Sequence, residues 1–516
     1  MAEGGDGMHY LSVLVFLVLI SGTLILTALA ARRVKTDRDF YAAGGQIPGW
    51  QNGLAIAGEF MASGAFLGIA GLIAFHGLDG EIFSICWFAS FFVVLVLVAE
   101  VIRNSGKYTF VDIVSYRLDA SKIRPAVAIT VFVVSLAYLI PQMVAAGALS
   151  RILFGISDTM GILIVGGLMI VYVSLGGMMA ATWIQSIKAI FLLAGGYILA
   201  ALTMSHFDFS VPQLFAAVAE SPELGEQWIQ QGGWLSNPIE RYSLGLSLLF
   251  GTAAMPHVLM RMFTVKTKQQ AQKSALWTMV FMGMFHMITF IFGLGAAVLV
   301  GRQAIAAMDP GGNLATPMLA QFVAGGAGTF TGELFMAFIV SVAFITVIAT
   351  VSGLCIAAST AFSYDFWFKV VKKGHQEHAE QVRTARIAAI AIGILSILVS
   401  LLLKNVNVAY LSGLAFSIAA TVNLPAIILA LYWRKLTTQG AMAGILSGMA
   451  LSLFAVLGGP SFMGKAAIFP LANPGIVTIP LGFLITWAVS CLTADERAKV
   501  KYEELSVRAH SGLGAE

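Results

Sequence analysis

The chain has 516 residues, of which 58% are hydrophobic and 11% are charged, and its formal net charge is +4. These values exclude a water-soluble protein, because the apolar residues fall in runs of about 20 or more, the length that crosses a bilayer. The small positive charge indicates no nucleic-acid partner. The three cysteines lie in apolar runs without the spacing of a disulfide framework or a metal cluster. The sequence therefore predicts a polytopic protein embedded in a lipid bilayer.

Thirteen apolar runs are typical of transmembrane helices. In chain order they cover residues 10–31, 50–74, 82–101, 124–152, 158–177, 180–203, 242–262, 274–300, 331–364, 384–403, 408–433, 436–457 and 474–493. The first run lacks the basic region and the cleavage site of a signal peptide, so we expect it to be retained.

Basic residues predict how these helices are oriented. They gather in alternate loops, at Arg32, Arg33, Lys35 and Arg38, at Arg103, Lys107, Arg117, Lys122 and Arg124, at Arg261, Lys266, Lys268 and Lys273, at Lys369, Lys372, Lys373, Arg383 and Arg386, at Arg434 and Lys435, and after residue 493. The loops between them are nearly free of Lys and Arg. Because cytoplasmic loops carry the excess of basic residues, we expect the N-terminus outside and the C-terminus in the cytoplasm. The expected location is the cell membrane, which in a bacterium is the inner membrane.

The second predicted helix is rich in glycine, with five residues at Gly53, Gly58, Gly64, Gly68 and Gly71. A glycine inside a helix costs roughly 0.5–1 kcal/mol relative to alanine, so this helix is expected to break. Secondary transporters use broken helices to offer backbone carbonyls to a cation at the middle of the membrane. The alternative interpretation is that the glycines allow helices to pack closely.

The ninth predicted helix carries Thr346, Ala349, Thr350 and Gly353 on one stripe, at steps of three and four residues. Hydroxyl oxygens on that stripe could complete an oxygen shell around a cation. The alternative is that each hydroxyl donates to the carbonyl four residues earlier, as membrane threonines often do.

Two charged residues, Glu59 and Lys188, lie near the interiors of predicted helices. An intramembrane charge is a functional candidate by default, so both are candidates for coupling. The alternatives are that Glu59 ties helices together or lies near an aqueous vestibule, and that Lys188 extends toward the cytoplasm.

Five long segments resemble the sodium/solute symporter family, and within it the cation/acetate symporters. They read DFYAAGGQIPGWQNGLAIAGEFM at 39–61, RNSGKYTFVDIVSYRL at 103–118, GGMMAATWIQSIKA at 176–189, LFGTAAMPHVLMRMFTV at 249–265 and YWRKLTTQGAM at 432–442. The resemblance extends over nearly the whole chain. It is specific for the family and less so for the substrate, since near relatives carry other short monocarboxylates.

The resemblance implies an all-α, LeuT-like fold in one transporter domain. It would contain an extra N-terminal helix, two inverted repeats of five helices, two C-terminal helices and a cytoplasmic tail, at residues 10–31, 50–203, 242–433, 436–493 and 494–516. The first helix of each repeat would be broken, with Gly251 and Pro256 as candidate break points in the second repeat.

The same resemblance implies a Na⁺ site with five residues, Gly58, Met61, Thr346, Ala349 and Thr350. Gly58 and Met61 would contribute carbonyls. Relatives commonly have two adjacent hydroxyl residues where this chain has Ala349 and Thr350, so Thr346 would have to supply the missing oxygen.

Gln185 stands where relatives with a second cation site carry an aspartate. Its neutral side chain favours one coupled cation per cycle and leaves H⁺ open as an alternative to Na⁺.

An acetate-like substrate would lie beside the break, near Gly64 and Ala65, by family position. Such a carboxylate needs hydrogen-bond donors and little room. Gln142 is the best side-chain donor on the fourth predicted helix, with Tyr138 one turn before it. The alternative for Gln142 is a hydrogen bond to a neighbouring helix.

The leading interpretation is a symporter, not an enzyme, that needs no cofactor and couples Na⁺ entry to uptake of acetate or a similar monocarboxylate by alternating access. The alternatives are an H⁺-coupled symporter and a transporter-like sensor, although such sensors add a long cytoplasmic signalling region. An ATP-driven pump is disfavoured because no GxxxxGK[ST] phosphate loop occurs. An ion channel would need a filter, usually reached by oligomerisation or rings of charge. The sequence predicts no oligomeric state.

Overall fold

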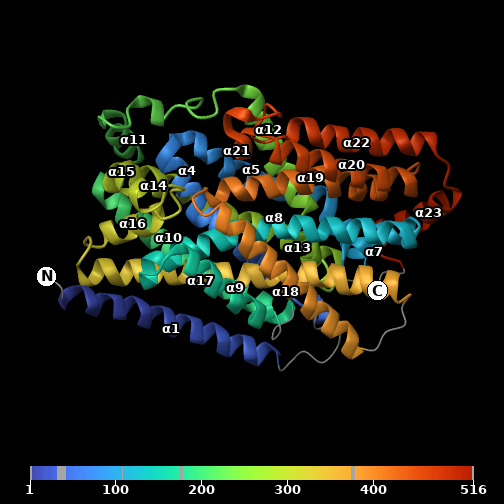
Figure 1. Cartoon of the computed structure of the whole chain (residues 1–516), viewed down its shortest axis with the longest axis horizontal. Helices are drawn as coiled ribbons and strands as arrows, with labels where there is room; N and C mark the ends of the chain where they lie inside the picture. The colour runs from blue at the N-terminus through green and yellow to red at the C-terminus, as the bar shows by residue number, and fades with distance from the viewer. Residues whose placement is uncertain (1–2, 32–41, 107–108, 174–177, 374–377, 514–516) are drawn as a thin grey trace.

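The computed structural model describes residues 3–31, 42–106, 109–173, 178–373 and 378–513, and these residues form an all-helical bundle (Figure 1). The N-terminal half contains α1 (Glu3–Ala31), α3 (Gly49–Phe60), α4 (Ile69–His76), α5 (Ile82–Val93), α6 (Ala99–Ser105), α7 (Phe110–Arg117), α8 (Ala120–Phe154), α9 (Asp158–Val173), α10 (Met178–Met204) and α11 (Val211–Glu220). The C-terminal half contains α12 (Pro238–Gly251), α13 (Pro256–Arg261), α14 (Lys268–Gly295), α15 (Arg302–Met308), α16 (Ala315–Val323), α17 (Phe330–Thr360), α18 (His378–Leu402), α19 (Val408–Tyr432), α20 (Thr438–Leu457), α21 (Pro460–Met463), α22 (Gly475–Leu492) and α23 (Glu496–Ser511). The predicted fold class, an all-α membrane protein with discontinuous helices, is confirmed.

Helices occupy all thirteen ranges that hydropathy predicts, within the residues that the structure describes. Ten helical segments of the described residues are long and apolar enough to cross a bilayer. The two numbers differ partly because α4 runs through a tight turn into α5, so that Gly64–Ser105 counts as one continuous segment. The number of membrane-spanning helices, thirteen, stays a prediction.

The first predicted break is present, but it does not fall on a glycine. α3 ends at Phe60, Met61 has a ψ of 44°, and a π-helical segment, Gly64–Gly68, leads into α4. The glycines instead mark close helix contacts. A Cβ at Gly58 would lie 2.2 Å from the carbonyl oxygen of Gln185. The alternative interpretation of the glycines, close packing, therefore describes this position.

The second break lies where Pro256 predicts it. α12 passes into a 3₁₀ turn at Thr252–Ala254, Met255 is extended with a ψ of 121°, and Pro256 begins α13. Proline lacks an N–H and biases the preceding residue toward extended backbone, so the helix must stop there and can restart at the proline. Gly251, the other candidate, keeps helical angles.

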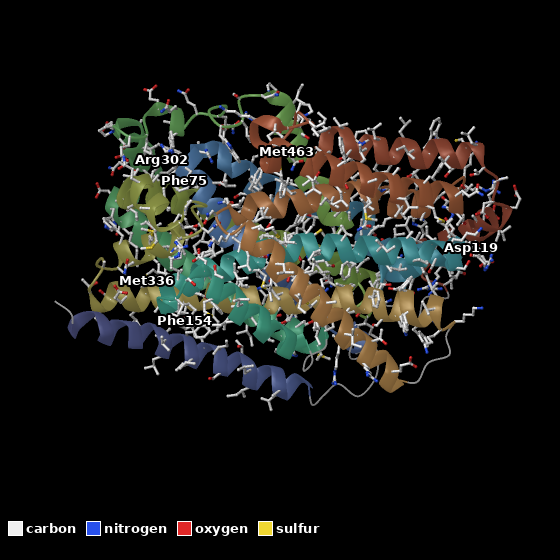
Figure 2. All side chains as sticks on the ribbon, in the orientation of Figure 1. Phe75, Asp119, Phe154, Arg302, Met336 and Met463 are labelled. Atoms are coloured by element: carbon white, nitrogen blue, oxygen red, sulfur yellow. The ribbon has the colours of Figure 1, made fainter. Side chains whose placement is uncertain are left out.

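The two ends of the bundle are distinct. α11 and α15 lie at one end, and α23 lies at the other (Figure 1). Asp119 marks the α23 end, whereas Phe75 and Arg302 mark the α11 end (Figure 2).

Along one edge of the bundle, α1 packs against α17 (Figure 1). Phe16 of α1 has its ring centroid 5.1 Å from that of Phe154, which is labelled in Figure 2, and 5.0 Å from that of Phe344.

Candidate functional site

Two groups of buried side chains lie beside the break between α3 and α4. The charged cluster consists of Glu59, Lys188 and Arg261, each at most 2% exposed. The aromatic cluster consists of Phe60, Trp87, Tyr138, His257 and Phe416, all of them buried. Adjacent residues of α3, Glu59 and Phe60, belong one to each cluster, so the end of α3 joins the two.

Glu59 forms a buried ion pair with Arg261. The Arg261 Nε donates to Glu59 Oε2 at 3.0 Å, and Arg261 Nη1 donates to the Thr182 hydroxyl at 2.8 Å. This pair links α3, α13 and α10, as the helix-tying interpretation of Glu59 expects. Arg261, predicted to lie in a basic loop, is instead the last residue of α13, and its side chain is 1% exposed.

Lys188 lies inside the bundle and does not extend toward the cytoplasm. It is 2% exposed, and its Nζ donates to the Thr346 carbonyl oxygen at 3.3 Å and to the Thr350 hydroxyl at 3.2 Å. Both acceptors belong to α17. Lys188 therefore bridges α10 and α17 through two residues predicted to bind Na⁺, although at Thr346 it contacts the carbonyl oxygen and not the predicted hydroxyl.

Of the five predicted Na⁺ ligands, Gly58, Thr346 and Thr350 lie around the Lys188 segment of α10. A Cβ at Gly58 would lie 3.1 Å from Ala189 Cβ. The hydroxyl of Thr346 donates to the Val342 carbonyl at 2.7 Å, as the alternative interpretation of this helix expects.

The remaining two predicted ligands have other surroundings. Ala349 lines a very small cavity toward α1, together with Ile20 and Thr23. Met61 lies at the break itself, where its N–H donates to the Ala57 carbonyl at 2.8 Å.

Gln185, one turn before Lys188 on α10, is fully buried. Neither its amide oxygen nor its amide nitrogen has a hydrogen-bond partner among the described residues. Leaving such groups unpaired costs about 1–3 kcal/mol each, so an orphaned buried amide calls for an explanation.

The aromatic cluster surrounds Phe416 of α19. The ring centroids of Trp87, Tyr138 and Phe60 lie 5.6, 5.5 and 6.0 Å from that of Phe416. His257, the residue after Pro256, stacks on Tyr138 at 5.4 Å with an interplanar angle of 8°. The two helix breaks, one at Met61 and one before Pro256, therefore contribute to one cluster.

Several polar atoms in and beside the aromatic cluster lack partners among the residues that the structure describes. They are Trp87 Nε1, Gln142 Nε2, both ring nitrogens of His257 and the Ser417 hydroxyl. The other end of the Gln142 amide is used, since its Oε1 accepts from the Ser63 hydroxyl at 2.8 Å. Both interpretations of Gln142 thus apply, because it ties α8 to the break and keeps its donor nitrogen unpaired.

Gly64 and Ala65, the predicted substrate neighbours, are buried just after the break. A Cβ at Gly64 would lie 3.0 Å from the Ser412 hydroxyl of α19 and 3.3 Å from the Trp87 ring of α5, so little space remains between the π-helical segment and these two helices. Sequence reasoning missed Trp87, His257 and Phe416. The only signal for His257 was its place after the predicted break, and Trp87 and Phe416 gave none.

A cavity of about 520 Å³ opens at the α11 end of the bundle, and Leu72, His76, Trp234, Glu240 and Tyr410 are among its lining residues. Met61, where the backbone breaks, lies eleven residues before Leu72 on the same interrupted helix, which places the break roughly 16 Å from the cavity floor. The cavity is therefore a candidate vestibule above the aromatic cluster.

Comparison with known proteins gives consistent results. A model of the sodium:solute symporter family matches residues 40–448. The chain is 40% identical over 518 residues to the uncharacterised symporter YwcA of Bacillus subtilis (strain 168), and the match covers 99% of this chain and 100% of that protein.

Two solved structures share the fold. One is a Na⁺-coupled sialic acid symporter in a substrate-bound, outward-open state, with a TM-score of 0.76 at 16% identity over 94% of this chain and 98% of that chain. The other is the nucleobase-cation-symport-1 transporter Mhp1, with a TM-score of 0.55 at 14% identity over 91% and 99% of the two chains. These likenesses support the predicted LeuT-like fold.

Proposed function

Because the chain belongs to the sodium:solute symporter family, we propose that it is a secondary symporter that couples Na⁺ entry to uptake of acetate or a similar short monocarboxylate. The family supports Na⁺ as the coupling ion. The observation that carries the choice of substrate is the set of unpartnered donors in and beside the aromatic cluster, to which both helix breaks contribute.

A carboxylate would satisfy these donors. Trp87 Nε1 and Gln142 Nε2 are obligate N–H donors, and His257 offers one N–H in its neutral form. Hydrogen bonds to a charged group are worth about 1.5–3 kcal/mol, which can offset dehydration of a small anion. The tight contact at Gly64 favours a substrate with a very small apolar body.

We assign Na⁺ to Gly58, Met61, Thr346, Ala349 and Thr350, and coupling to Glu59, Gln185 and Lys188. Gly64, Ala65, Tyr138 and Gln142 remain the proposed substrate neighbours, to which we add Trp87 and His257. Two inverted repeats at 50–203 and 242–433 remain the proposed organisation, because each would begin with one of the two broken helices.

We also propose that the α11 end faces outward and the α23 end faces the cytoplasm. Single cysteines that replace Glu223 and Lys372 in a cysteine-free variant should then react differently with a membrane-impermeant maleimide. In sealed cells, only the cysteine at 223 should label, whereas both should label after permeabilisation. Labelling of 372 alone in sealed cells would reverse the orientation.

Uptake of radiolabelled acetate into proteoliposomes tests the function and the site together. Wild-type protein should accumulate acetate when a Na⁺ gradient is imposed. Trp87→Phe, which removes one N–H and keeps an aromatic ring, should raise the KM for acetate about tenfold or more, the equivalent of one hydrogen bond to a charged group.

The matched control is Trp487→Phe, because Trp487 is 51% exposed on α22 and far from either cluster in sequence. Its KM should equal that of the wild type. A normal KM in Trp87→Phe would place the substrate elsewhere, and wild-type uptake that ignores Na⁺ but follows a pH gradient would favour the H⁺-coupled alternative.

A further inference from the structure

The amino group of Lys188 takes the place that a Na⁺ ion is expected to take. It lies 3.2 Å from the Thr350 hydroxyl oxygen, a proposed ligand atom, and 3.3 Å from the carbonyl oxygen of Thr346, a residue whose hydroxyl is the proposed ligand. A third proposed ligand, Gly58, packs against the same segment of α10. One position between α3, α10 and α17 therefore has two candidate occupants.

The two occupants exclude each other. An ammonium group donates hydrogen bonds to lone pairs and Na⁺ is coordinated by lone pairs, so both cations compete for the oxygens of Thr346 and Thr350. Two cations sharing these oxygens would also repel strongly at low dielectric.

The charges around Lys188 relieve that repulsion only in part. Among the described residues, the charged side chains that act on Lys188 are Glu59 of α3, which attracts a cation, and Arg261 of α13, which repels it. The carboxylate of Glu59 already pairs with Arg261 at 3.0 Å, so it does not balance two further cations.

We propose that Lys188 is a tethered competitor of Na⁺, whose amino group holds the cation site when Na⁺ is absent and must withdraw before Na⁺ binds. The proposal rests on the proposed function in taking Na⁺ as the ion and the residues assigned to it as the site. In the ion-free carrier, Lys188 joins α10 to α17. Na⁺ bound to the proposed ligands would instead join the end of α3 to α17. Lysine thereby sets how much Na⁺ is needed to load the site.

Gln185 offers the Lys188 amino group an alternative hydrogen-bond acceptor. Its unpartnered Oε1 lies three residues earlier on the same helix, a separation at which side chains on one helix face meet. Exchange of the Thr346 and Thr350 oxygens for Gln185 Oε1 would free the site without leaving the amino group unpaired.

The test measures Na⁺ binding on purified protein, as the rise in the midpoint of thermal unfolding with NaCl relative to choline chloride. A site open to Na⁺ only one-tenth of the time binds about tenfold more weakly than its intrinsic affinity. Lys188→Met, which keeps the length and removes the amino group, should therefore lower the half-saturating Na⁺ concentration about tenfold or more. Lys188→Arg keeps a cation and should not lower it.

Controls separate competition from general effects. Lys435→Met makes the same chemical change at an exposed position and should leave Na⁺ binding unchanged. Adding Thr350→Val to Lys188→Met should weaken Na⁺ binding again, because it removes an oxygen that both occupants use. If Lys188→Met does not fold, Lys188→Gln carries the same expectation.

Equal Na⁺ affinity in wild type, Lys188→Met and Lys188→Gln would overturn the proposal, as would loss of Na⁺ binding in both variants. This test measures Na⁺ binding and the test of the proposed function measures acetate uptake, so the two hypotheses can fail independently. Tighter Na⁺ binding in Lys188→Met, together with no acetate uptake by the wild type, would reject acetate as the substrate and support Lys188 as a competitor of Na⁺. Na⁺-driven acetate uptake by the wild type, together with unchanged Na⁺ affinity in the Lys188 variants, would support the proposed function and reject Lys188 as a competitor.

Discussion

Replacing Glu59 with glutamine is expected to lower the free energy of unfolding by about 3–5 kcal/mol, the usual cost of removing one partner from a buried ion pair. The substitution leaves the side chain nearly the same size but takes the counter-charge from Arg261, which is 1% exposed. The Thr182 hydroxyl still accepts from Arg261 Nη1, but a neutral hydroxyl does not balance a buried charge. Thermal unfolding of the purified protein in detergent measures the loss.

The chain contains a matched control for this prediction. Arg434 and Glu503 form an ion pair at 2.7 Å in which both side chains are 63% exposed. Glu503→Gln makes the same chemical change but should cost only about 0–1 kcal/mol, because water screens the pair and solvates the arginine left behind.

A double variant tests whether loss of charge balance, and not loss of packing, causes the destabilisation. Glu59→Gln combined with Arg261→Met removes both charges and should recover part of the lost stability, since replacing a buried pair by apolar residues is often nearly neutral. Equal unfolding midpoints for Glu59→Gln and Glu503→Gln would show that the Glu59–Arg261 pair contributes little. A double variant less stable than either single variant would show that packing, not charge, dominates.

Hydropathy predicted the fold well because each helix must bury its backbone polar groups within itself in lipid. The predicted range 331–364 compares with α17 at Phe330–Thr360, and 124–152 compares with α8 at Ala120–Phe154. The break before Pro256 was also predictable, because proline imposes it locally.

The site was less predictable because it depends on contacts between distant segments. Glu59 was a candidate by its charge alone, but its partner lies 202 residues later, and no local pattern identifies Arg261. Similarly, the sequence placed Lys188 on a helix without fixing the direction of its side chain. The aromatic cluster draws single residues from α3, α5, α8, α13 and α19, so that its composition emerges only from packing.

The glycines of the second predicted helix were noticed in the sequence, but their physical role could not be predicted from it. A glycine in a helix is compatible with weakness or with close approach, and sequence spacing does not distinguish the two. The backbone turns at Met61, whereas Gly58, Gly68 and Gly71 face neighbouring backbone within 2.4 Å of a Cβ position. The glycine pattern indicated an unusual helix, but the glycines allow close helix packing and do not themselves form the break.

Gly58→Ala is therefore expected to destabilise the protein by about 3 kcal/mol, the upper part of the range for overpacking. Its Cβ would lie 2.2 Å from the carbonyl oxygen of Gln185 and 3.0 Å from the carbonyl carbon. These atoms are backbone, so no side-chain rotation relieves the clash, and α3 must move away from α10. In a solvated helix the same change would stabilise by roughly 0.5–1 kcal/mol, so the expected sign is opposite to that of helix propensity.

Gly167→Ala on α9 is the matched control, because nothing lies within 4 Å of its Cβ position. It should keep or raise the unfolding midpoint, while Gly58→Ala lowers it. Separation of α3 from α10 should also disturb the oxygens around Lys188, so Gly58→Ala should weaken Na⁺-induced stabilisation and Gly167→Ala should not. If Gly58→Ala unfolds at the same temperature as Gly167→Ala, α3 and α10 lie farther apart than this contact implies.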